Sequence, residues 1–277
     1  MKQRLLVAAV GVPLLLVVLL VLPPVATMVL VCAIAGVAAY ELLHTAGKNI
    51  PPVVYVLTIV MSVLTAVCLS GRQWWAYDTA LRIYLVCAFL YAMTLFFIAV
   101  HTHGLESAMP FASVAVCFVG AFVFPAMYSC VALLRSISPA FVLMPFVVAF
   151  IGDSFSMLGG MAFGKRKFAP RVSPNKTWAG FLAGPIGSGL GMALLCLVCR
   201  WAWSMELPVW YFAMVGVVAN VFGQLGDLSM SLIKREAGIK DYSHIFLTHG
   251  GMLDRFDSRM FLSPVVYAAV MWMEAAL

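Results

Sequence analysis

Long apolar runs separated by short polar segments dominate this sequence. A run of about 17–25 apolar residues is long enough to cross a bilayer as a helix. Nine such runs can be marked, at residues 4–22, 25–43, 53–70, 83–100, 111–134, 140–158, 178–199, 209–230 and 260–276. Since 64% of the residues are hydrophobic and only 10% are charged, a water-soluble fold could not bury the apolar surface. We predict an all-α, polytopic integral membrane protein with about nine transmembrane helices.

The basic residues are distributed unevenly between the connecting loops. If the N-terminus and every second loop share one side of the membrane, that side holds 13 of the 17 Lys and Arg residues. Because basic loops remain cytoplasmic, we expect the N-terminus and both long polar loops there, in a protein of the cytoplasmic (inner) membrane. The net charge of +6 then reflects loops that face anionic headgroups, so no nucleic-acid partner is expected.

Charge also differs between the two halves of the chain. Residues 1–152 carry nine charged side chains, whereas residues 153–259 carry eighteen. We therefore predict a transmembrane scaffold or lipid-facing module over residues 1–138, with about five spans. Residues 139–277 are predicted to form a catalytic module with about four spans and two polar cytoplasmic loops.

The first polar cluster begins within the sixth apolar run. Asp153 is a carboxylate at membrane depth, which is costly unless it faces a partner or a water-filled cavity. The following loop contains glycines, the cations Lys165-Arg166-Lys167, and residues 173–178 with two hydroxyls and Lys176. Such groups can cradle phosphate. A basic loop that only fixes the topology is the alternative reading, and this cluster alone does not decide between them.

Two further clusters contain the other carboxylates. Asp227 lies at the end of the eighth apolar run, and Asp254 and Asp257 are three residues apart, on one face of a helix, just before the ninth. Three carboxylates form a hard-oxygen site that suits Mg²⁺. Between them lie Lys234-Arg235 and His249, which we interpret as groups that contact phosphate. The pattern favours metal-assisted phosphoryl or nucleotidyl transfer, and no Ser-His-Asp or Cys-His arrangement is apparent.

The segment from Ser231 to Asp257 resembles the signature of the phosphatidate cytidylyltransferases, or CDP-diacylglycerol synthases. It reads Ser-Leu-Ile-Lys-Arg, then Lys240-Asp241, then His-Gly-Gly-Met-Leu-Asp-Arg-Phe-Asp. Gly226-Asp227-Leu228 and the upstream Ser-Pro-Asn-Lys-Thr-Trp match the same family in order and spacing. The resemblance implies transfer of the cytidylyl group of CTP to phosphatidic acid, with Mg²⁺ and a second cation such as K⁺.

The resemblance also implies roles for individual residues. The expected metal ligands are Asp227, Asp254 and Asp257, and they form the expected catalytic set together with Lys176 and Lys234. The expected substrate-binding residues are Ser173, Ser231, Arg235, Lys240, Asp241, His249, Gly250, Gly251 and Arg255. The expected partners are CTP, phosphatidic acid and membrane lipids, and a homodimer is left open.

The chain departs from the family pattern at three places. Leu247-Thr248 replaces the usual Pro-Gly, Asn175 replaces a second Lys, and Ala179 replaces an acidic residue. None of these changes removes an expected metal ligand. There are two alternatives to this function. One is a CDP-alcohol phosphotransferase, whose Asp-Gly-x-x-Ala-Arg motif is absent; the other is an ion-coupled transporter that would use Asp153 and Asp227 at a midplane site.

Overall fold

The computed structural model describes residues 11, 13–71, 77–243, 245 and 250–276. Within this part of the chain, seven helices are long and apolar enough to cross a membrane. They span Pro24–Ala46, Pro52–Ser70, Asp78–Thr102, Phe111–Ile137, Pro139–Phe163, Trp178–Trp203 and Val209–Glu236. The predicted all-α, multi-pass membrane fold is confirmed.

The predicted number of nine spans is not confirmed. Residues 4–10 and 12 of the first expected run, 4–22, lie outside the described residues. The ninth run, residues 260–276, falls within helix α10 (Leu253–Ala276), which is not among the seven apolar helices. The first two turns of α10 contain four charged residues, including Asp254 and Asp257, so only its later part is suited to lipid.

The chain forms two compact units. The first contains residues 1–133 together with 237–255, and the second contains residues 134–236 and 256–277. The structure thus groups residues 237–255 with the first unit rather than with the second, where a continuous module 139–277 was expected. The assignment of scaffold and catalytic roles to the two parts stays a prediction.

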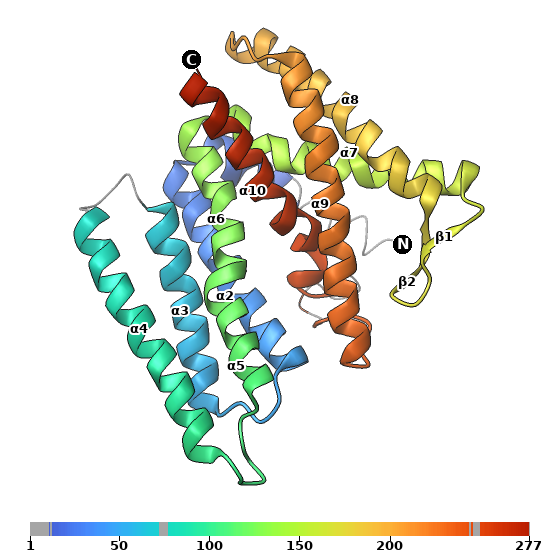
Figure 1. Ribbon diagram of the computed structural model, residues 1–277. Coiled ribbons are helices and arrows are strands. Elements are labelled where there is room, and N and C mark those ends of the chain that lie inside the picture. Colours follow the sequence, from blue (N-terminus) through green and yellow to red (C-terminus); the bar gives the residue numbers. More distant parts are fainter. Residues whose placement is uncertain (1–10, 12, 72–76, 244, 246–249, 277) are drawn as a thin grey trace. The chain divides into compact units, whose positions relative to one another are not determined.

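Helices that run side by side build the first unit (Figure 1). They are the π-helical turn η1 (Val17–Val21), α2 (Pro24–Ala46), α3 (Pro52–Ser70), α4 (Tyr77–Thr102), α5 (Phe111–Phe118), η2 (Val119–Val123) and most of α6 (Phe124–Ile137). Prolines open α2 and α3, where the missing N–H has no cost. Hydroxyls bond across helices: Thr65 Oγ1 donates to the Ala121 carbonyl at 2.8 Å and Ser62 Oγ to that of Ala35 at 3.1 Å. Such bonds help to hold helices together in lipid, where apolar burial gives little driving force.

The second unit combines helices with a small hairpin. Its elements are α7 (Pro139–Phe163), β1 (Lys167–Ala169), β2 (Ser173–Thr177), α8 (Trp178–Trp203), α9 (Val209–Glu236) and the remainder of α10. The antiparallel strands β1 and β2 connect α7 to α8, and Figure 1 shows the hairpin projecting beyond the helix ends. Glycines allow α8 to approach its neighbours closely. A Cβ on Gly187 would lie only 2.2 Å from the Phe155 ring, and one on Gly216 only 2.6 Å from the Ser188 carbonyl oxygen.

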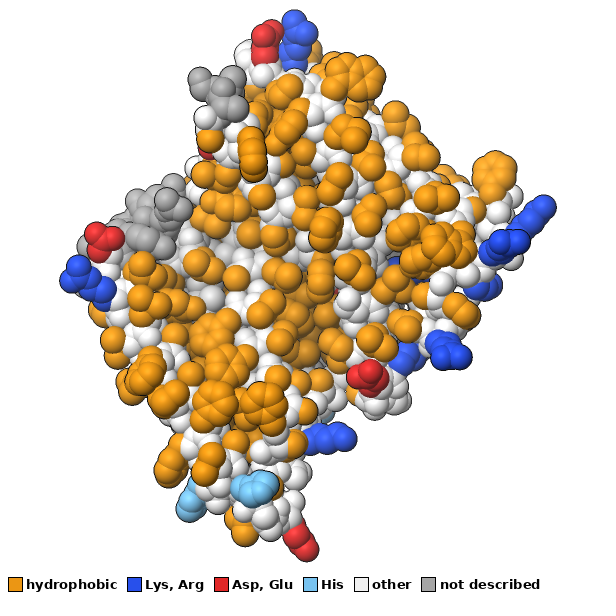
Figure 2. All heavy atoms as spheres, in the orientation of Figure 1, with side chains coloured by type: hydrophobic (Ala, Val, Ile, Leu, Met, Phe, Trp, Pro, Cys, Tyr) orange, Lys and Arg blue, Asp and Glu red, His pale blue; other side chains and the backbone are white. Residues whose placement is uncertain are grey.

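Apolar side chains cover much of the outer surface of these helices. In Figure 2, hydrophobic side chains extend over most of the visible face, while Lys and Arg side chains gather around the hairpin. Trp201 is 87% exposed and Phe163 is 77% exposed. Exposed aromatic and aliphatic side chains at this density indicate lipid as the solvent of the helices.

Candidate functional site

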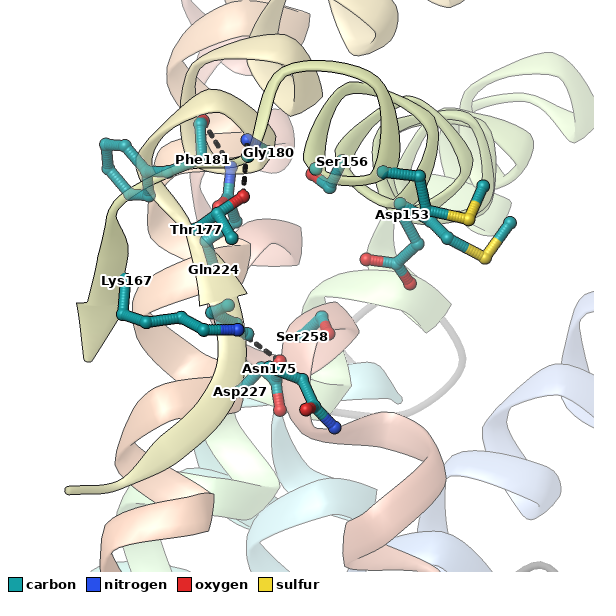
Figure 3. Close-up of a pocket in the computed structure, with 15 residues that line it drawn as sticks. Asp153, Ser156, Lys167, Asn175, Thr177, Gly180, Phe181, Gln224, Asp227 and Ser258 are labelled. Atoms are coloured by element: carbon teal, nitrogen blue, oxygen red, sulfur yellow. Dashed lines mark hydrogen bonds and ion pairs between the residues drawn. The ribbon is translucent and has the colours of Figure 1, made fainter. Parts of the chain in front are cut away.

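The second unit contains a cavity of about 420 Å³ at the base of the hairpin (Figure 3). Four helices and the hairpin contribute to its wall. The lining residues are Asp153, Ser156, Met157, Gly160, Met161, Gly164, Lys167, Asn175, Lys176, Thr177, Gly180, Phe181, Gln224, Asp227 and Ser258. Segments far apart in sequence, including the first and second polar clusters, therefore meet in one place.

The hairpin brings a cation to a carboxylate of α9. Lys176 on β2 forms an ion pair with Asp227, drawn as a dashed line in Figure 3. Strand β2 ends at Thr177, whose Oγ1 accepts a hydrogen bond from the Gly180 N–H at 3.2 Å and so caps the N-terminus of α8. This cap fixes the end of the strand next to Lys176. The structure thus brings together two of the residues that the sequence predicts to be catalytic.

Asp257 is buried in the first turns of α10, before the apolar run. Its Oδ1 accepts hydrogen bonds from the Ser258 N–H at 2.7 Å and from Ser258 Oγ at 3.1 Å. Burial, and secondly the nearby Asp227 carboxylate, raise the pKa of Asp257 above its usual range. The two predicted metal ligands of the second unit are therefore close enough to repel each other electrostatically, with Lys234 acting in the opposite sense.

The carboxylates of the second unit suit a hard cation. Asp227 and Asp153 line the same cavity, and Asp257 interacts with Asp227. Two like charges held near each other in a partly buried place favour a divalent cation with oxygen ligands. Among the described residues, however, no three His, Cys, Asp or Glu side chains are grouped closely enough to hold a metal. The triad of Asp227, Asp254 and Asp257 therefore stays a prediction.

Polar residues that the sequence analysis did not single out also reach the cavity wall. Gln224 Nε2 donates to Asn220 Oδ1 at 2.7 Å and to the Phe181 carbonyl at 3.1 Å. Ser156 Oγ is buried, and within the described residues it has no hydrogen-bond partner. Two amide side chains four residues apart in an apolar run were a signal that could have identified Gln224 as part of the wall.

In the first unit, Asp254 organises the loop before α10. Its Oδ2 accepts hydrogen bonds from the Tyr242 N–H and from the Gly251 N–H, both at 2.8 Å. Gly250 has φ +77°, and a Cβ there would lie 2.7 Å from Asp254 Oδ2. Both glycines of the His-Gly-Gly motif thus contribute to the loop conformation, while His249 and Leu247-Thr248 lie outside the described residues.

The other expected site residues that the structure describes do not line the cavity. Ser231, Lys234 and Arg235 belong to the last turns of α9, and Arg235 Nε donates to the Val172 carbonyl of the hairpin at 3.4 Å. Ser173 begins β2 but does not line the cavity. In the first unit, the remaining expected residues are Lys240, Asp241 and Arg255.

Comparison with known proteins agrees with the motifs. A family profile described as the cytidylyltransferase family matches residues 2–273. Over 132 residues the chain is 39% identical to a phosphatidate cytidylyltransferase of Staphylococcus epidermidis, covering 48% of this chain and 49% of that protein. Over 195 residues it is 31% identical to the phosphatidate cytidylyltransferase of Rickettsia prowazekii, covering 66% of this chain and 84% of that protein. The chain spans about half the length of the staphylococcal relatives that it matches. With its profile match over nearly the whole length, the chain belongs to the cytidylyltransferase family.

Proposed function

We propose that this protein transfers the cytidylyl group of CTP to phosphatidic acid, forming CDP-diacylglycerol and pyrophosphate in the cytoplasmic membrane. The N-terminus and the polar loops would face the cytoplasm, where CTP is dissolved. The observation that carries the proposal is the cavity in which Lys176 of the hairpin pairs with Asp227 of the apolar helix α9, in a member of the cytidylyltransferase family. The names of the relatives support phosphatidic acid as the acceptor.

The reaction requires positioning and charge neutralisation rather than a protein nucleophile. A phosphate oxygen of phosphatidic acid attacks the α-phosphorus of CTP, and the bond from that phosphorus to the β-phosphate oxygen breaks as pyrophosphate leaves. Lys176 and Lys167 line the cavity and supply positive charge for the phosphates. Because the acceptor provides its own nucleophilic oxygen, the lack of an apparent Ser-His-Asp arrangement is consistent with this chemistry.

The composition of the cavity wall suits a lipid with a phosphate headgroup. Met157 and Met161 of α7 line the cavity and are 60% and 69% exposed. Their side chains lie on a helix that crosses the membrane, so acyl chains can stay in lipid while the headgroup lies near Lys176. Asp153 extends from α7 into the same space (Figure 3).

We expect a divalent cation at the carboxylates of this site. Asp227 and Asp257 would hold Mg²⁺, with Asp254 as the third predicted ligand and K⁺ as a second cation. When bound, Mg²⁺ supplies charge neutralisation for the triphosphate. Lys176, already paired with Asp227, would hold the phosphates beside these carboxylates.

The proposal is tested with purified protein in detergent, labelled CTP, phosphatidic acid and Mg²⁺. Lipid-dependent formation of CDP-diacylglycerol is expected from the wild type, and its loss is expected from Asp257→Ala and after chelation with EDTA. Glu106→Gln changes an exposed carboxylate of the first unit and serves as the matched control. A wild-type protein that neither binds CTP with Mg²⁺ nor forms product would contradict the proposal. The alternative of ion-coupled transport is not supported by the family match.

A further inference from the structure

Helix α2 of the first unit contains a buried carboxylate outside the family signature. Glu41 is 1% exposed and lies in the second-last turn of a helix that is apolar enough to span a membrane. A carboxylate in this position is costly unless it is paired or hydrogen-bonded. Its partners therefore show what it contributes.

Among the described residues, the side-chain hydrogen-bond partners of Glu41 lie in the loop that precedes α10 and at the first residue of α10. Glu41 Oε1 accepts hydrogen bonds from Ser243 Oγ at 2.5 Å and from the Met252 N–H at 2.9 Å. Glu41 Oε2 accepts one from the Leu253 N–H at 2.8 Å. Leu253 is the first residue of α10, whose first N–H groups need acceptors from outside the helix. A side chain more than 200 residues away in sequence thus caps α10, where the helix dipole also favours a negative charge.

The carboxylate also explains a glycine of the signature. A Cβ on Gly251 would lie 2.3 Å from Glu41 Oε1 and 2.6 Å from Ser243 Oγ, so a larger residue would displace these contacts. The Gly251 N–H donates to Asp254, the expected metal ligand in the next turn. Glu41 and Asp254 therefore hold the same short segment from two sides.

We propose that Glu41 is a positioning residue for the cytidylyl transfer, an inference that rests on the function proposed above. It fixes Ser243, and the backbone of Met252 and Leu253 at the start of α10. Next to Met252 lie Gly250 and Gly251, whose backbone is expected to shape the triphosphate pocket. Glu41 itself touches neither substrate and acts by holding these groups in place.

Glu41→Gln tests this role with little change in size. The carboxamide keeps one acceptor oxygen, but its NH₂ group must face at least one of the donors that now bond to the carboxylate. The negative charge at the helix N-terminus is also lost. Because hydrogen bonds to charged groups are strong, we expect kcat to fall by about 10- to 100-fold, with a raised KM for CTP. The KM for phosphatidic acid should stay within about twofold, since the cavity in the second unit is not altered.

The control is Glu106→Gln, which makes the same chemical change at an exposed position of the same unit and should behave as the wild type. A second measurement follows the conformation of the loop independently of catalysis. The rate of trypsin cleavage after Lys240, measured by mass spectrometry, should be higher in Glu41→Gln than in the wild type. Kinetics are normalised to the monodisperse, folded fraction. A residue that only stabilised the fold would lower the yield or the melting temperature without changing the KM for CTP.

The two proposals fail in different ways. Absence of product from the wild type would overturn the proposed function. An active wild type beside a folded Glu41→Gln variant with unchanged kcat and KM for CTP would overturn the role of Glu41 alone.

Discussion

Neutralising Lys176 tests the part of the site that the structure defines most directly. Lys176→Met keeps an unbranched side chain about one atom shorter and removes the ammonium group that pairs with Asp227. The variant leaves the Asp227 carboxylate without this counter-charge. It also removes the cation that we expect to contact phosphate.

The size of the effect follows from the exposure of the pair and from the charge of the substrate. Two unit charges about 4 Å apart interact by about 4 kcal/mol at an effective dielectric constant near 20. Since the two side chains are 26% and 34% exposed, the pair contributes only about 1 kcal/mol to stability after solvent screening. A lost charge-assisted hydrogen bond to phosphate costs more, about 1.5–3 kcal/mol, which corresponds to about a 10- to 150-fold lower kcat/KM.

The assay is formation of CDP-diacylglycerol at varied CTP concentration, with the melting temperature measured in parallel. Lys176→Arg should retain more activity than Lys176→Met because it retains the charge. The matched control is Arg171→Met, which removes an exposed cation from the turn of the same hairpin and should lower kcat/KM by less than about threefold. If Lys176→Met and Arg171→Met give the same small effect, Lys176 contributes only to the general positive charge of the loop, and the reasoning is refuted.

Three further substitutions test the local structure. Thr177→Val removes the acceptor that caps α8 and should lower the free energy of unfolding by about 1 kcal/mol, seen as a lower melting temperature in detergent, whereas Thr177→Ser should not. Gly187→Ala places a Cβ 2.2 Å from the Phe155 ring and should cost about 1–3 kcal/mol; an unchanged melting temperature would contradict the close packing of α7 and α8. Gly250→Ala places a side chain on a residue with φ +77°, at a cost of about 1–2 kcal/mol. The variant should have a raised KM for CTP, and a wild-type KM would show that the loop tolerates the change.

The sequence predicts the architecture well because lipid imposes simple rules on composition. Uninterrupted apolar runs identified the seven membrane-crossing helices of the described residues, with boundaries that differ by a few residues at most ends. Helix α7 continues to Phe163, beyond the predicted end at residue 158. Gly159 and Gly160 do not end this helix, because they allow it to pack tightly against α8. The start of helix α10 could not be predicted from apolar runs, because its charged first turns lie in the same helix as the apolar segment.

The site was only partly predictable, because long-range contacts leave little trace in local patterns. The pairing of Lys176 with Asp227 agrees with the expectation that both belong to one site, although the motifs alone did not place them in contact. Glu41 was not singled out, since an isolated carboxylate near the end of an apolar run gives no sign of which loop it binds. Gln224 on the cavity wall and its partner Asn220 were missed for a related reason, because the apolar residues around them define the span.

The position of a radioactive label in the lipid product tests the central claim most directly. The protein is incubated with phosphatidic acid and Mg²⁺, and with CTP labelled either at the α- or at the γ-phosphorus. Cytidylyl transfer predicts label in the lipid from α-labelled CTP alone, with the γ-label recovered in pyrophosphate. Label in the lipid from γ-labelled CTP would instead show phosphoryl transfer, and would contradict the account of this site.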